Sequence, residues 1–93
     1  HPEILRCLGW SIFHSGDRRR GLVILERAKA MAPQDTLIMC DLAVCYLNDR
    51  QFVETIALLE TALALEPHNE KAKDCLETAK FFKREFKKLK EEK

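Results

Sequence analysis

The sequence is poor in residues that break helices and in patterns that hold metals or cofactors. Its 93 residues include only three Gly and three Pro, which argues against a small β-barrel or sandwich with its many turns. The four cysteines, at positions 7, 40, 45 and 75, form no C-x-x-C pair, and no other metal-ligand spacing occurs. A Gly-rich phosphate loop is missing too. We therefore expect no enzyme, no cofactor and no bound metal.

Long apolar runs and a large net charge are also missing. No stretch approaches the roughly 20 apolar residues of a membrane span, and no signal peptide is visible. The formal net charge is +1, so we expect no general attraction to nucleic acid. The basic run Arg18–Arg20 and the Lys-rich end at 80–93 keep a weaker nucleic-acid alternative open. We expect the four cysteines to be free thiols rather than to form two disulfides. Free thiols indicate a reducing, cytoplasmic compartment.

An internal repeat of 34 residues is the strongest pattern present. Residues 2–35 can be laid over residues 36–69 so that large apolar residues meet large ones, small residues meet small ones and proline meets proline. The first copy supplies Leu5, Leu8, Gly9, Ile12, Gly21, Leu25, Ala28 and Pro33. The second copy supplies Met39, Leu42, Ala43, Tyr46, Thr55, Leu59, Ala62 and Pro67.

This period and these residues resemble the tetratricopeptide repeat (TPR) family, in which each repeat is a helix–turn–helix unit. The segments "SGD" at 15–17 and "ALALEPHN" at 62–69 match the family's usual turn and repeat ending. The resemblance implies an all-α solenoid in a single domain over 1–93: repeat one at about 2–35, repeat two at about 36–69 and a capping helix at about 70–93. Gly9 and Gly21 would then let the two helices of the first repeat approach closely.

Helix start and stop signals predict five helices. Their expected ranges are about 2–14, 18–31, 36–48, 52–65 and 70–91, with Asp35 or Thr36 capping the third and Asn69 the fifth. The last helix carries a narrow apolar stripe. We expect its far end, at Phe86 and Leu89, to project beyond the repeats.

In the TPR family, the first helices of successive repeats line a concave groove. Carried over by position, the resemblance implies a partner-binding groove of Arg6, Trp10, Phe13, Leu37, Cys40, Asp41, Val44, Leu47 and Phe81. The middle of this set is apolar, which suits a partner's amphipathic helix laid in by its apolar face. The ninth positions hold Trp10 and Val44 rather than Asn, so a clamp for a peptide carboxylate is not expected.

Two functions remain open for such a groove. The stretch "LGWSIFHSGDRRRGLVILERAKAMAPQD" resembles the opening repeat of the small TPR chaperones of bacterial type III secretion, the YscY-like proteins. This resemblance implies a chaperone that covers a helix of a secretion substrate or export component until export. The alternative is an adaptor or scaffold segment of a larger TPR protein. A homodimer that covers the apolar residues is a further alternative.

Overall fold

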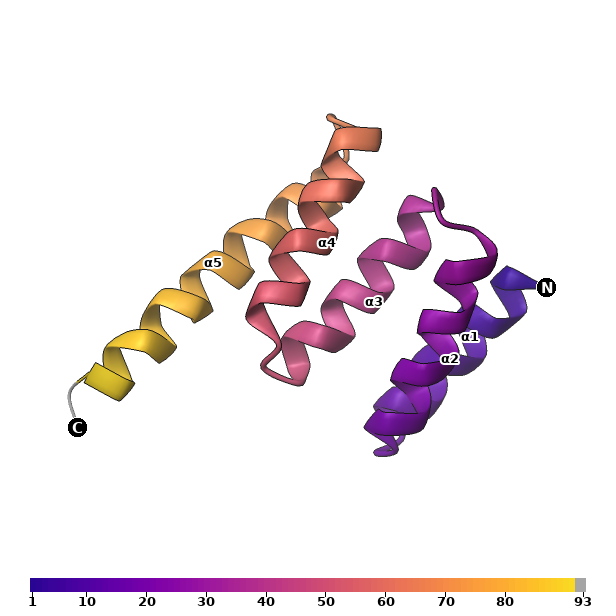
Figure 1. Cartoon of the computed structure of the whole chain (residues 1–93), viewed down its shortest axis with the longest axis horizontal. Coiled ribbons are helices and arrows are strands. Elements are labelled where there is room, and N and C mark those ends of the chain that lie inside the picture. The colour runs from indigo at the N-terminus through magenta and orange to yellow at the C-terminus, as the bar shows by residue number, and fades with distance from the viewer. Residues whose placement is uncertain (92–93) are drawn as a thin grey trace.

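The structure, a computed structural model, describes residues 1–91 (Figure 1). Within these residues, the regular secondary structure consists of helices alone. The helices are α1 (Pro2–His14), α2 (Arg18–Met31), α3 (Thr36–Asn48), α4 (Phe52–Leu65) and α5 (Glu70–Glu91). These bounds agree with the expected helix ranges. The last two residues of the expected capping segment, 92–93, lie outside the described residues. None of the described helices is long and apolar enough to cross a membrane.

Local capping and turn residues explain where the helices begin and end. The Asp35 carboxylate accepts hydrogen bonds from the backbone N–H of Leu37 and Ile38, and the Asn69 side chain accepts one from Ala72. These bonds satisfy backbone donors that the first helical turn leaves free. The turn after α1 has Gly16 at φ +115°, and 34 residues later Arg50 also takes a positive φ, of 62°.

The helices form two antiparallel hairpins, followed by α5. The pairs α1–α2 and α3–α4 pack side by side, and the central helix α3 also contacts α1, α2 and α5. Helices α1, α3 and α5 run in roughly the same direction and form one layer (Figure 1). Helices α2 and α4 lie on the other side and do not contact each other within the described residues.

Two glycines set the close approach of α1 and α2, as the sequence predicts. A Cβ atom added at Gly21 would lie 2.6 Å from both the Cβ and the backbone nitrogen of Phe13. A Cβ added at Gly9 would lie 2.8 Å from Cγ of Leu25 and 3.1 Å from the carbonyl oxygen of Gly21. Only residues without side chains fit at this crossing, because real Cβ atoms do not approach other atoms so closely.

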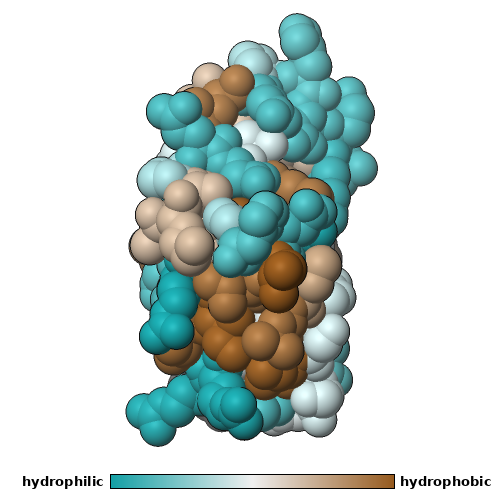
Figure 2. Space-filling model, turned by 90° about the vertical axis from the view of Figure 1, so that its right-hand side faces the viewer, coloured by the Kyte–Doolittle hydropathy of each residue, from teal (hydrophilic) through white to brown (hydrophobic). Residues whose placement is uncertain are grey.

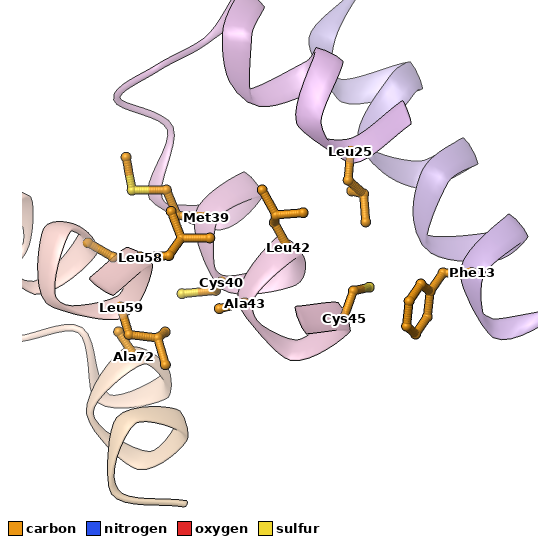
Figure 3. Packing of buried hydrophobic residues seen from close by; sticks show 11 residues of the cluster. Phe13, Leu25, Met39, Cys40, Leu42, Ala43, Cys45, Leu58, Leu59 and Ala72 are labelled. Carbon is orange, nitrogen blue, oxygen red and sulfur yellow. The ribbon is translucent and has the colours of Figure 1, made fainter. Parts of the chain in front are cut away.

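The hydrophobic core lies on both sides of α3. Figure 3 shows Leu42 and Cys45 pointing toward Leu25 and Phe13 of the first hairpin. On the other side of α3, Leu58 and Leu59 of α4 pack with Met39, Cys40, Ala43 and Ala72 of the same cluster. Eight residues of α3 are buried, so this helix is the central element of the described chain.

The far end of α5 is not free of the body, which corrects our expectation for Phe86. Its ring lies 5.6 Å from that of Phe52, and the Arg50 guanidinium lies 5.3 Å from its centroid. Because α4 begins at Phe52 beside this part of α5, the body reaches further along the last helix than expected. Leu89, by contrast, is exposed.

Candidate functional site

All nine residues of the expected groove lie on the layer formed by α1, α3 and α5. The part of this layer near the N-terminal halves of the three helices is charged. Arg6 of α1 donates a hydrogen bond from Nη1 to Oδ2 of Asp41, over 2.7 Å. Lys71 of α5 reaches Oδ1 of the same carboxylate over 3.4 Å. A chain of ion pairs therefore links the three helices near their N-terminal halves.

The Asp41 carboxylate is buried, and its neighbours make this burial tolerable. A buried carboxylate is costly unless cations and donors surround it. Its hydrogen bond raises the pKa of Arg6 above the ordinary value, because the bond favours the charged guanidinium. Arg6 and Asp41 are thus occupied with each other, and the charged half joins the helices together.

The part of the layer on the C-terminal halves of the three helices is apolar. Trp10 and His14 of α1 place their ring centroids 4.2 Å apart. Val44 and Leu47, on the C-terminal half of α3, are half-buried. On α5, the exposed ring of Phe81 lies edge-on to that of Phe82, with centroids 5.6 Å apart. Trp10, Val44, Leu47 and Phe81 therefore keep accessible apolar surface on three adjacent helices.

Three of the expected groove residues lie inside the core instead of on an open surface. Phe13, Cys40 and Asp41 are each no more than 5% exposed. Phe13 packs against the bare backbone of Gly21, Cys40 belongs to the central cluster and Asp41 binds Arg6. The accessible members of the expected groove are therefore Arg6 in part, Trp10, Leu37, Val44, Leu47 and Phe81.

A hollow of about 300 Å³ borders the apolar half, and the groove residues predicted above include only Leu47 of its lining. It is lined by Leu47, Asn48, Arg50, Phe52, Phe82 and Phe86. Arg50 enters it from the turn between α3 and α4, and Phe52 from the first position of α4; the groove positions of the TPR family include neither. The apolar stripe of α5, with Phe82 and Phe86, was the available signal for this hollow.

Three of the four thiols have pKa values shifted away from the reactive thiolate form. Burial raises the pKa of Cys40 and Cys75, and it raises that of Cys45 to about 12. A reactive cysteine needs the opposite shift, toward the thiolate. Within residues 1–91, no group of three or more His, Cys, Asp or Glu side chains could hold a metal ion.

A second hollow lies on the opposite side, between α2 and α4. Its volume is about 510 Å³, and its lining includes Leu42 and Tyr46 of α3. The Tyr46 hydroxyl donates a hydrogen bond to Glu26 of α2. Burial is the main cause that raises the pKa of Tyr46 above its ordinary value. This hydrogen bond connects the two hairpins beside the hollow.

The comparisons with known proteins do not assign a family to the chain. A scan against models of protein families finds no match, and a search of curated proteins finds none either.

Proposed function

We propose that this chain is a non-enzymatic protein-binding module of the TPR type, which holds an amphipathic helix of a partner protein against its α1–α3–α5 layer. The observation that carries the proposal is the apolar half of this layer. Trp10, Val44 and Leu47 are only half-buried, and Phe81 is 49% exposed. Accessible apolar side chains gathered on adjacent helices are typical of a protein-binding surface.

The composition of this surface favours a helix as the bound element. Large aromatic side chains such as Trp10 and Phe81 are the residue types that dominate binding energy in protein interfaces. An amphipathic helix inserts apolar residues at every third and fourth position into such a groove. The adjoining hollow at Phe82 and Phe86 offers room for one such side chain.

The charged half of the layer supports a partner held by apolar contacts. The Arg6 guanidinium is already hydrogen-bonded to Asp41, so it is less available to bind a carboxylate of a peptide. Lys71 shares the same carboxylate. We therefore propose that the partner's helix lies over the C-terminal halves of α1, α3 and α5.

The role that we propose for this chain comes from the resemblance to the type III secretion chaperones. A small chaperone of this kind would cover the apolar helix of a secretion substrate or export component in the cytoplasm. Binding to the folded state would also stabilise the chain itself.

Site-specific photo-crosslinking tests where the partner binds. A photoreactive phenylalanine analogue placed at position 81 should capture a partner in native cells, and the cross-linked segment should be an amphipathic helix. The matched control is the same analogue at Val53, which is 64% exposed on α4. Equal capture of the same segment at both positions would contradict the proposed binding surface.

A further inference from the structure

The outer edge of the first hairpin, where no helix of the described chain covers it, presents a second apolar surface. Figure 2 views the molecule from the side of α1 and α2 and shows apolar atoms gathered in the middle and lower part of this face. We define the hairpin edge as Ile4, Leu8 and Ile12 of α1 with Ile24 of α2. Ile4 and Leu8 are exposed, and the other two are half-buried.

The internal repeat shows what such a face binds. Counting 34 residues on, Ile4 and Leu8 correspond to Ile38 and Leu42 of α3. Ile4 is 67% exposed and Leu8 47%, whereas Ile38 and Leu42 are 0% and 1% exposed. The difference arises because α2 packs against α3, and Leu42 points toward Leu25 of α2 (Figure 3). The hairpin edge thus has the chemistry of a face that a helix normally covers.

The same packing recurs one step further along the chain. Ala72 of α5 corresponds to Ile4 and Ile38, and it is fully buried where α5 packs against α4 and α3. Figure 3 shows Ala72 beside Leu59 of α4. Two helices of this molecule, α2 and α4, therefore already pack onto faces equivalent to the hairpin edge.

Charge indicates which kind of helix fits. Residues 2–31 carry six Lys and Arg side chains against three Asp and Glu, a formal net charge of +3. Arg20 and Arg27 are exposed on α2, near Ile24 in the sequence. A two-fold contact between two copies would bring these positively charged hairpins together, which is unfavourable. An acidic helix would be attracted instead.

We propose that the hairpin edge is a docking surface for an amphipathic helix of a partner protein, with an apolar stripe flanked by acidic residues. This surface includes none of the nine groove positions, so the proposal does not depend on the proposed function. Its occupant would take the place relative to α1 that α2 takes relative to α3.

A synthetic peptide of residues 51–66 is a suitable probe. It contains the sequence of α4, a helix of the type that packs on the equivalent face of α5, and it has three Glu and no Lys or Arg. We expect the peptide, titrated to about 1 mM, to shift the NMR signals of Ile4, Leu8, Ile12 and Ile24 in the labelled full chain. A peptide with all three Glu replaced by Lys should bind more weakly.

Matched variants make this test decisive. Leu8→Asp should weaken peptide binding by at least about tenfold, since it removes a buried leucine contact. Val53→Asp, at an exposed position of α4, should leave binding unchanged. If Leu8→Asp loses its helical circular dichroism, Ile4→Asp replaces it, because Ile4 is more exposed.

Three results would overturn the proposal. The first is the absence of signal shifts over the whole titration. The second is shifts centred on α3 and α5, which would mean that the peptide replaces α4 or binds the α1–α3–α5 layer. The third is a concentration-dependent dimer in light scattering that Leu8→Asp abolishes, which would make a second copy the occupant of the hairpin edge.

Discussion

Single residues decide how closely the helices of this chain approach. Gly9 and Gly21 lack the Cβ atoms that would separate α1 from α2. A glycine within a helix costs about 1 kcal/mol relative to alanine, and the close contact of the two helices offsets this cost. Phe13 can become buried only because Gly21 leaves room for it.

Gly21→Ala should therefore destabilise the protein despite the better helix propensity of alanine. The new methyl group would meet backbone atoms of Phe13, which cannot move independently of the helix. Overpacking of this kind costs about 1–3 kcal/mol, and we expect a net loss of about 1 kcal/mol or more in the free energy of unfolding. Urea denaturation measures this loss.

Gly9→Ala provides a comparison, because a methyl group at this position should reduce the free energy of unfolding by a smaller amount. Its nearest new contact is the Leu25 side chain, at 2.8 Å, and a side chain can adjust more easily than backbone. The loss for Gly9→Ala should be the smaller of the two. A Gly21→Ala protein as stable as the wild type would show that the close crossing is not required.

Cys45 should make the stability depend on pH in alkaline solution. Burial raises its pKa from 9.0 to about 12, so the folded chain keeps a proton that the unfolded chain loses. The contribution is complete below pH 9 and is lost as the pH rises toward 12. The expected slope is about 1.4 kcal/mol per pH unit in this window.

Denaturation of the wild type and of Cys45→Ala at several pH values separates this contribution from others. Tyr46 also has a raised pKa, so the variant should keep part of the alkaline destabilisation. Identical slopes for the wild type and Cys45→Ala would contradict the prediction.

At the scale of elements, α3 organises the molecule because it contacts each of the other four helices. Apolar packing joins it to α2 and α4, whereas the Asp41 carboxylate joins it to α1 and α5 through Arg6 and Lys71. The two ion pairs differ in exposure: the side chain of Arg6 is 18% exposed and that of Lys71 is 53% exposed. Their energies should differ accordingly.

Asp41→Ala should destabilise the fold by about 3 kcal/mol, because it removes the buried carboxylate that pairs with the largely buried Arg6 and leaves only the exposed Glu3 beside it. Lys71→Ala should cost less than about 1 kcal/mol, as exposed ion pairs usually do. Chemical denaturation of both variants in low salt checks this order. A loss for Lys71→Ala as large as that for Asp41→Ala would contradict this order, because it would show that the pair with Lys71, and not the pair with Arg6, accounts for the effect of the carboxylate.

At the scale of the whole molecule, the sequence predicts the helices better than the binding surface. All five helix ranges were predictable because their signals are local and occur twice: caps such as Asp35, turn residues and the prolines at 33 and 67. The close contact at Gly9 and Gly21 was predictable for the same reason.

The groove was less predictable because exposure depends on how the helices sit relative to one another. Phe13, Cys40 and Asp41 occupy groove positions by sequence, yet neighbouring helices bury them. Phe86 was expected beyond the body, but the start of α4 reaches it through Phe52. The periodicity of the sequence predicts on which side of its helix a residue lies. It does not predict how far the neighbouring helices extend over that side.

The central claim, that the apolar half of the α1–α3–α5 layer binds a partner's helix, is tested most directly by co-purification. The wild type and a Trp10→Asp/Val44→Asp double variant would be used to capture proteins from native lysate, with quantitative mass spectrometry as the readout. Circular dichroism must show that both remain helical. We predict that one small partner with an amphipathic helix is captured by the wild type and lost with the double variant. Equal capture by both proteins would contradict the claim.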